Sequence, residues 1–287
     1  MTTVTGPRLP AVFAIAPWRR LPRDPVLLLA GSVCVLLVLV AVFAPLIAPY
    51  PPDQTNILYQ NLSPSANHLL GTDALGRDIL SRLIYGSRLS LLGPGLVVLV
   101  CVVVGTSLAI ASVWIGGLVD RAVARALDVV FAFPALLLAI LAVAILGQGL
   151  TAPVIALSVA YIPYVARVVR SVALRERHLP YIESCRSMGF SGWRICTFHL
   201  LPNVRLMVAA QATIAFASAL MDLSAISFLG LGVQPPASDW GTMVSDGTSA
   251  LVNGHAMESL AAGSAIAIAV IAFNVLGERL NRASEAA

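Results

Sequence analysis

Long uncharged, apolar stretches alternate along this chain with short segments in which most of the charged residues gather. The first three uncharged runs contain 28, 31 and 38 residues, at 25–52, 89–119 and 129–166. About 20 apolar helical residues cross the hydrocarbon core of a bilayer, so each of the first two runs predicts one membrane span. The third run is long enough for two spans, which the Gly-Gln-Gly turn at 147–149 and the following Pro153 divide.

Two further apolar runs complete this pattern. One extends from about Leu206 to Gly232 and contains a single acid, Asp222, and the other has 19 uncharged residues between Glu258 and Glu278. The chain is therefore predicted to be an all-α polytopic membrane protein with six transmembrane helices. The predicted helices are 26–48, 89–113, 124–146, 150–170, 206–232 and 258–278.

The composition agrees with a membrane protein and restricts its chemistry. Hydrophobic residues make up 58% of the chain and charged residues 11%, whereas a soluble domain has about 25% charged residues. All 18 basic residues are arginine. Without lysine the chain has neither a Schiff-base nucleophile nor the lysine of a phosphate-binding loop. If the protein uses ATP, another chain must bind it.

The arginines predict how the helices are oriented. With the N-terminus in the cytoplasm, 15 arginines lie inside and three outside, as the positive-inside rule requires. Residues 1–25 are then a flexible cytoplasmic tail, 171–205 a long cytoplasmic loop and 283–287 a cytoplasmic C-terminal tail. The segments 49–88 and 233–257 lie outside. The predicted location is the plasma membrane, which the chain crosses several times; the family resemblance described below implies that this membrane is bacterial.

The end of the first outside segment has the pattern of an amphipathic helix. Asp73 is placed to cap its N-terminus, Ile79 and Leu83 share an apolar face, and Arg77 and Arg82 share the polar face. Such a helix is expected to lie in the membrane interface, with its arginine stems snorkelling toward water. This pattern fits two alternatives. The helix is either a simple connection between spans, or an element that takes part in gating or in contact with a receptor.

The second outside segment is predicted to turn sharply at the membrane surface. Gly230, Gly232, Pro235 and Pro236 prevent the fifth span from continuing there as a helix. Trp240, which follows, is expected to be an interfacial anchor, because tryptophan is enriched at the level of the lipid head groups.

The cytoplasmic loop 171–205 contains two stretches that are compatible with short helices. The first, 181–188, is expected to end at Gly189, because glycine suits the left-handed residue that terminates many helices. The second, 191–199, is expected to stop before Pro202.

The strong positive charge of this loop is compatible with two roles. Glu183 and Arg186 have the i,i+3 spacing of a weak helical ion pair. Docking of a partner protein explains a long, structured loop of this kind, and so does binding of anionic lipid.

Asp222 is the acid in the middle of a predicted span. An intramembrane carboxylate costs at least about 2.5 kcal/mol, so it is expected to face the bundle interior or a water-filled path. A pathway residue, a hydrogen-bonded structural acid and a helix end displaced toward the interface remain equal alternatives. A different class of function, an ion-coupled secondary transporter, would use Asp222 as its carrier, although a single acid supports it weakly.

Enzyme and metal chemistry find no candidate residues in this sequence. It has no paired intramembrane acids, no H-E-x-x-H and no G-x-S-x-G, and its four histidines are scattered. We therefore predict no catalytic residue, no cofactor and no metal. The four cysteines are expected to be buried or structural thiols.

Three stretches, in order, resemble one family. The loop at 171–205 is similar to the EAA signature of ABC-importer permeases, E-A-A-x3-G-x9-I-x-L-P. Glu183 and Gly189 hold the E and G positions, and Leu201-Pro202 hold the final pair at the right spacing.

The departures from this signature indicate a particular branch. Ser184 and Cys185 stand in place of the two alanines, and His199 stands in place of isoleucine. A histidine there, followed by L-L-P-N, resembles the dipeptide/oligopeptide branch. The stretches HLLGTDALGRDILSRLIYGSRLSL and SFLGLGVQPPASDWGTM are similar to the same branch.

The resemblance is to the C-type permease subunit of dipeptide/oligopeptide ABC importers, and implies a type I ABC-importer permease with a core over 89–282. It implies a homologous B-type permease, two ATP-binding cassette ATPase domains and an extracytoplasmic peptide-binding protein as partners, and no nucleic acid. The implied cargo is a di- or oligopeptide, with nickel chelate, glutathione or haem as alternatives. The residues implied to couple to the ATPase are Glu183, Ser184, Cys185, Arg186, Gly189, His199, Leu201 and Pro202.

Overall fold

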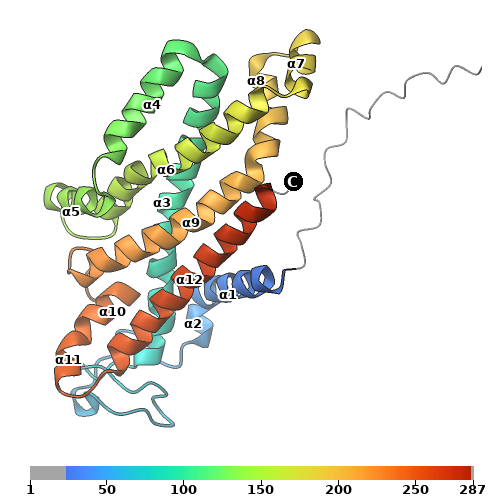
Figure 1. Ribbon diagram of the computed structural model, residues 1–287. Coiled ribbons are helices and arrows are strands. Elements are labelled where there is room, and N and C mark those ends of the chain that lie inside the picture. The colour runs from blue at the N-terminus through green and yellow to red at the C-terminus, as the bar shows by residue number, and fades with distance from the viewer. Residues whose placement is uncertain (1–23, 286–287) are drawn as a thin grey trace, which may run out of the picture.

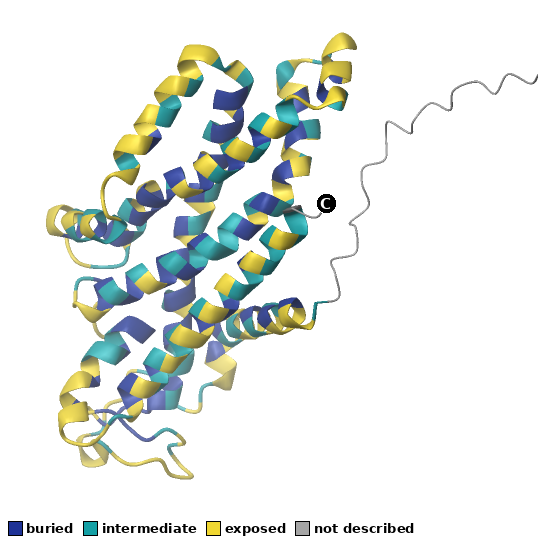
Figure 2. Ribbon diagram, in the orientation of Figure 1, coloured by how far each residue is buried: buried dark blue, intermediate teal, exposed yellow. Residues whose placement is uncertain are grey.

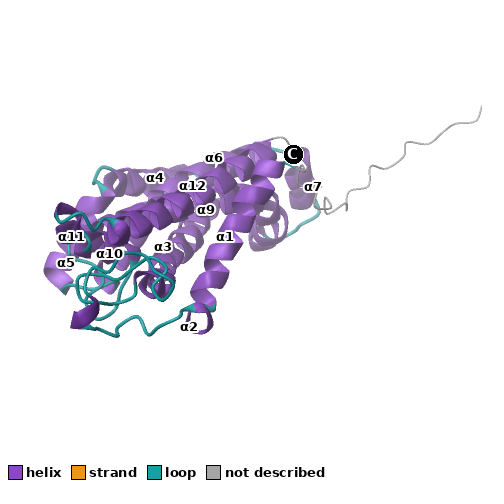
Figure 3. Cartoon of the chain, turned by 90° about the horizontal axis from the view of Figure 1, so that it is seen from below, coloured by secondary structure: helices purple, strands orange, loops and turns teal. Residues whose placement is uncertain are grey.

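The computed structural model describes residues 24–285, and all regular structure within that range is helical (Figures 1 and 3). Most of the predicted N-terminal tail, 1–25, lies outside the described residues. The helices in chain order are α1 (Pro25–Val42), α2 (Ala44–Ile47), η1 (Ile57–Tyr59), α3 (Ile79–Ile115), α4 (Gly117–Phe131), α5 (Ala135–Leu146), α6 (Thr151–Arg177), α7 (Pro180–Ser187), α8 (Gly192–Ile195), η2 (Cys196–Leu200), α9 (Leu201–Phe228), α10 (Trp240–Asp246), α11 (Thr248–Val252) and α12 (Met257–Glu285).

Between residues 24 and 285, five helices are long and apolar enough to cross a membrane: α1, α3, α6, the helix that α8, η2 and α9 form together, and α12. A sixth span exists only if α4 and α5 are counted together, and these two helices are bent by 77° at their junction. The predicted third span, 124–146, is therefore broken. Phe133 precedes Pro134, and a residue before proline disfavours the α conformation, which explains the break.

The core forms where α3, α6 and α9 pack together, and α12 lies along α9 and α1 (Figure 1). Val97 of α3, Leu157 and Val165 of α6 and Ile226 of α9 are fully buried in this core. A Cβ atom at Gly105 would lie 3.1 Å from the carbonyl oxygen of a residue on α6, so the glycine lets α3 and α6 approach closely. Exposed residues lie along the outside of the bundle (Figure 2), and many of them are large and apolar. The four cysteines are free and buried, as predicted.

The amphipathic helix predicted after Asp73 does not form as a separate element. The helix begins at Ile79 and runs without a break through the 37 residues of α3. Asp78 caps it, because its carboxylate accepts hydrogen bonds from the backbone N–H and the hydroxyl of Ser81. The polar face is also turned inward: Arg82 is only 2% exposed and does not snorkel. Two of its three charged partners lie far away in the sequence.

Candidate functional site

The segment 171–205 folds into a helical unit at one end of the molecule, which appears at the top of Figure 1 around α7 and α8. It comprises the end of α6, then α7, α8 and η2, and the start of α9. The segment that contains α10 and α11 lies at the opposite end (Figure 1). The predicted coupling residues are thus brought together in one unit, whereas Asp222 lies elsewhere on α9.

Gly189 terminates α7 in the predicted left-handed conformation, with φ of 77°. The N–H of Gly189 donates to the carbonyl of Arg186 at 2.9 Å, and the N–H of Phe190 donates to the carbonyl of Cys185 at 3.1 Å. These two bonds form a Schellman motif, which satisfies the free carbonyls at the helix end. The predicted end of this helix is confirmed.

A small apolar core holds α7 and α8 together. Ile182, Cys185 and Ile195 are buried in it, and Trp114 at the end of α3 packs against them. A Cβ atom at Gly192 would overlap the indole of Trp114, so the start of α8 sits directly on this ring. Cys185, which stands where the signature has alanine, serves as a small buried side chain.

Hydrogen bonds connect three long helices through this unit. The hydroxyl of Tyr181 donates to Glu176 of α6 at 2.7 Å and accepts from the side-chain amide of Asn203 of α9 at 2.8 Å. Burial and the bond to Glu176 raise the pKa of the Tyr181 hydroxyl, so it stays a neutral donor. Arg177 donates to the carbonyl of Val113 near the end of α3. The segment is therefore linked to α3, α6 and α9.

The predicted helix stop before Pro202 is wrong, because α8, η2 and α9 form one continuous helix of 37 residues. η2 is a π-helical turn in which the N–H of Leu201 donates to the carbonyl of Cys196, five residues earlier. Proline lacks an N–H, and its ring would clash with the carbonyl of Phe198, four residues earlier, in a regular α-helix. The wider π turn relieves this conflict, so the helix passes through Pro202.

The predicted ion pair between Glu183 and Arg186 does not form. The Arg186 guanidinium lies over the ring of Trp114, 4.7 Å from its centroid. The Glu183 carboxylate is exposed and has no hydrogen bond or ion pair to any residue between 24 and 285. Ser184 is also exposed, and its hydroxyl donates to the carbonyl of Pro180 at 3.0 Å.

The rest of the unit presents large apolar side chains to its surroundings. Trp193 is 79% exposed and Phe198 72%, and Met188 and Leu201 are exposed as well. His199 is half-buried beside the Phe190 ring, and its Nδ1 has no hydrogen-bond partner among the described residues. The sequence analysis missed this apolar surface, although two aromatic residues in a strongly basic loop were a visible signal.

Asp222 is a hydrogen-bonded acid within the helix bundle. Its carboxylate accepts a bond of 2.9 Å from the hydroxyl of Tyr161 on α6. A hydrogen-bonded structural acid and a pathway residue are both compatible with this bond.

An ion cluster at the opposite end joins residues from four segments. We call Asp73, Arg77, Arg82, Asp246 and Glu258 the Arg82 cluster. The Arg82 guanidinium donates to Asp73 at 2.7 Å, to Glu258 at 2.5 Å and to Asp246 at 3.1 Å. All members except Asp246 are buried. The predicted exposed arginine face is thus replaced by a buried network, and the sequence analysis missed Asp246 and Glu258.

Trp240 belongs to the interior and is not the predicted interfacial anchor. It is 2% exposed, and its indole N–H donates to the carbonyl of Leu83 on α3 at 3.0 Å. Its backbone N–H donates to the hydroxyl of Ser90 at 2.9 Å. Asp239 caps α10 and accepts from the hydroxyl of Ser227 at 2.7 Å. Burial raises the pKa of the Asp239 carboxyl, although these hydrogen bonds oppose the shift.

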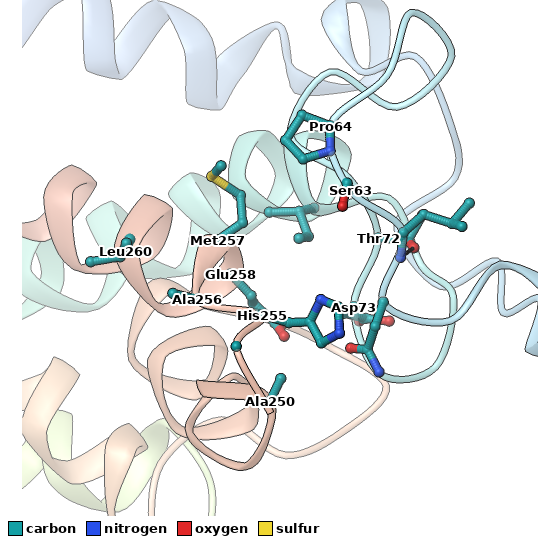
Figure 4. A pocket seen from close by; sticks show the side chains of 14 residues that line it. Ser63, Pro64, Thr72, Asp73, Ala250, His255, Ala256, Met257, Glu258 and Leu260 are labelled. Carbon is teal, nitrogen blue, oxygen red and sulfur yellow. Dashed lines mark hydrogen bonds between the residues drawn. The ribbon is translucent and has the colours of Figure 1, made fainter. Parts of the chain in front are cut away.

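A cavity of about 240 Å³ adjoins the Arg82 cluster. Figure 4 shows Asp73 and Glu258 on its wall, together with His255 from the segment before α12. No group of three histidine, cysteine or acidic side chains in the part of the chain that the structure describes is arranged to hold a metal ion.

The chain is thus a bundle of apolar helices, five of them long enough to cross a membrane within the described residues, with a folded unit at one end. Residues 101–287 match the family described as binding-protein-dependent transport system inner membrane component. Residues 14–64 match the N-terminal TM domain of oligopeptide transport permease C. The chain belongs to this family of inner-membrane transport components, which confirms the resemblance and the multi-pass membrane location.

Named relatives agree with this assignment over nearly the whole chain. The glutathione transport system permease protein GsiD of Pectobacterium atrosepticum is 39% identical over 269 residues, which are 93% of this chain and 88% of that protein. The dipeptide transport system permease protein DppC of Alkalihalophilus pseudofirmus is 35% identical over 274 residues, 94% of this chain and 90% of that protein.

The fold is similar to that of a solved structure described as inward-facing conformations of the MetNI methionine ABC transporter, native CY5 crystal form. The TM-score is 0.57 at 21% identity, and the match covers 72% of this chain and 97% of that one. At this identity the likeness shows the fold alone, and it agrees with the predicted permease architecture.

Proposed function

We propose that this chain is the permease subunit of an ATP-driven importer for di- or oligopeptides, and that it forms half of the translocation pathway. One observation carries the proposal: the segment 171–205 is a folded unit tied to α3, α6 and α9 that exposes apolar side chains at its surface. Such a surface fits a protein partner, because large apolar side chains that are exposed among polar ones, here Trp193 and Phe198, mark interaction sites.

The partner on this surface is an ATP-binding cassette ATPase. The arginine distribution, 15 against three, supports a cytoplasmic position for 171–205. The unpaired Glu183 and the exposed Trp193 and Phe198 are the residues we assign to the contact. Gly189 and Cys185 shape the unit from within, by ending α7 and by filling its core.

The contacts between this unit and the three long helices support coupling by rigid-body movement. Tyr181 links α6 to α9, and Arg177 and Arg186 link the unit to the end of α3. Movement of the ATPase against this unit would displace the three helices together, and packed helices respond to such displacement as bodies rather than by continuous deformation. A homologous B-type permease completes the pathway, with two ATPase domains on the cytoplasmic side and a peptide-binding protein outside.

The relatives support a peptide cargo, since their names concern a dipeptide and glutathione, itself a small peptide. Nickel chelate and haem are the alternatives within the same branch. Ion coupling through Asp222 has less support, because the carboxylate is hydrogen-bonded to Tyr161.

The test is uptake of a labelled dipeptide and of labelled glutathione by proteoliposomes that contain the chain with its partner permease, ATPases and binding protein. Uptake is expected to require internal ATP and to continue in the presence of an uncoupler. Asp222→Asn is expected to retain uptake, because asparagine can accept the same hydrogen bond. Uptake that survives ATP removal, stops with an uncoupler and is lost in Asp222→Asn would establish the secondary transporter instead.

A second measurement tests the contact surface. Trp193→Ala is expected to weaken association with the ATPase by about tenfold or more, since exposed aromatic side chains are frequent interface hot spots. Leu46→Ala is the matched control, because Leu46 is an apolar side chain on α2 that is 82% exposed and lies outside the segment 171–205. Equal ATPase association in the two variants would remove Trp193 from the interface.

A further inference from the structure

The Arg82 cluster joins segments that are far apart in the sequence. Arg82 stands in the first turns of α3, Asp246 ends α10, Glu258 begins α12, and Asp73 belongs to the turn that leads into α3. Glu258 is 176 residues from Arg82, and Asp246 is 164 residues away. A single guanidinium thus holds four segments together.

The contacts around Asp73 make this connection rigid. One carboxylate oxygen accepts the backbone N–H groups of Leu75 and Arg77, and the other accepts from the side chains of Arg77 and Arg82. Charged groups that are buried as deeply as these are tolerated only when they are paired, because an unpaired buried charge is strongly destabilising. The turn at 72–78 is therefore held to α3 at a fixed position.

Other bonds extend the rigid region. The N–H of Tyr50 donates to the hydroxyl of Ser81 at 3.0 Å, and His68 pairs with Asp78 at 2.9 Å. Trp240 bonds α10 to α3 at two points. The two stretches that resemble the dipeptide/oligopeptide branch, at 68–91 and 227–243, thus fold into one unit at this end of the molecule.

This unit also displays apolar side chains. Ile57 and Leu58 on η1 are 78% and 87% exposed, and Val252 on α11 is 89% exposed. Asn56, which caps η1, is held by a backbone bond to Leu75 beside Asp73. A contact made on η1 or α11 is therefore passed to the Arg82 cluster through hydrogen-bonded or directly adjoining segments.

We propose that Arg82 is a positioning residue for transport: it holds the segments that carry the exposed apolar residues of η1 and of α11 to α3, α10 and α12, so that contact with the binding protein moves these helices as one body. The family description supplies the binding protein as the partner. The inference rests on the proposed function, which assigns this end of the molecule to the outside. Arg82 itself does not touch the binding protein or the cargo.

The experiment measures the ATPase rate of the complete reconstituted complex as a function of the concentration of peptide-loaded binding protein. Asp246→Ala removes the acceptor that links α10 to Arg82 and leaves Arg82 paired with Asp73 and Glu258, so the fold is retained. The ratio of maximal stimulated rate to basal rate is expected to fall by about fivefold, at the lower end of typical coupling between sites. The half-saturating concentration of binding protein is expected to stay unchanged.

Two further variants complete the design. Arg82→Lys keeps the charge but loses the planar guanidinium that reaches three carboxylates. The ratio of stimulated to basal ATPase rate is therefore expected to fall further in this variant than in the Asp246 variant. Glu278→Gln is the matched control, because it removes an exposed pair with Arg282 at the other end of α12. Its ratio is expected to equal that of the unmodified complex.

The outcomes separate the alternatives. If Arg82 only stabilises the fold, the variants lower the basal and stimulated ATPase rates in proportion to the amount of intact complex. The ratio of the two rates then stays unchanged, and this result would overturn the proposal. A changed half-saturating concentration with an unchanged maximum would place the cluster in the docking surface, and would overturn it as well. If the unmodified complex shows no stimulation by the binding protein, the proposed function fails before the variants are compared.

Discussion

Replacement of Gly189 by alanine tests the local physics of the coupling unit. The backbone of Gly189 has φ of 77°, and no heavy atom lies within 4 Å of a Cβ atom built there. Alanine therefore meets no steric obstacle from neighbouring residues, and its cost is the left-handed conformation alone, about 1–2 kcal/mol. This free energy corresponds to an increase of about 5-fold to 30-fold in the population in which the turn between α7 and α8 is open.

Amide hydrogen exchange measures that population directly. The N–H groups of residues 189 and 190 close the Schellman motif at the end of α7, so their exchange in Gly189→Ala is expected to accelerate by the same factor. Gly189→Asn is expected to fall between alanine and glycine, because asparagine tolerates the left-handed region better than other residues. Peptide uptake by the assembled complex should follow the same order.

Gly263→Ala on α12 is the control with the opposite sign. A Cβ atom at Gly263 also meets nothing within 4 Å, but this residue is helical. Alanine is expected to stabilise α12 by about 0.5–1 kcal/mol. The reasoning is refuted if exchange at residues 189 and 190 is the same in glycine, asparagine and alanine variants, or if Gly263→Ala accelerates it equally.

Two predictions concern the packing of α10. Gly241→Ala is expected to lower the free energy of unfolding by about 1–3 kcal/mol, because its Cβ would lie 2.5 Å from a backbone carbonyl oxygen of α9. Thermal unfolding in detergent should show this loss. Gly95→Ala is the control without a loss, because no heavy atom lies within 4 Å of a Cβ atom there. Trp240→Phe is expected to cost about 1–3 kcal/mol through the lost indole hydrogen bond and ring volume, and an unchanged unfolding temperature would contradict the buried position of this ring.

The positions of the spans could be predicted because hydropathy and length are local properties of the chain. The described residues contain helices over nearly all of the predicted spans, and the glycine at 189 was recognisable because only its own backbone conformation is involved. The break in the third span was also encoded locally, by Pro134, and was overlooked. The continuation of the helix through Pro202 was not predictable in this way, since a π turn competes closely with a helix end.

The other predictions that failed concern polar and aromatic side chains at the ends of the spans. The amphipathic pattern after Asp73 was read as an interfacial helix, and Trp240 as an interfacial anchor, because both readings use only neighbouring residues. In the structure their partners come from other helices: Arg82 binds Glu258, and Trp240 binds Leu83. From the sequence alone, a charged side chain at the end of a span can be either exposed to water or buried beside a counter-ion.

The sequence by itself determined that this chain is a helical membrane protein, where its spans lie and which segment resembles a coupling loop, since these properties depend on runs of neighbouring residues. Tertiary structure alone decided which charges are buried and which surfaces are exposed. The reason is physical: an arginine enters the interior only when carboxylates are placed around it, and the carboxylates of Asp246 and Glu258 reach Arg82 only after α3, α10 and α12 have packed together.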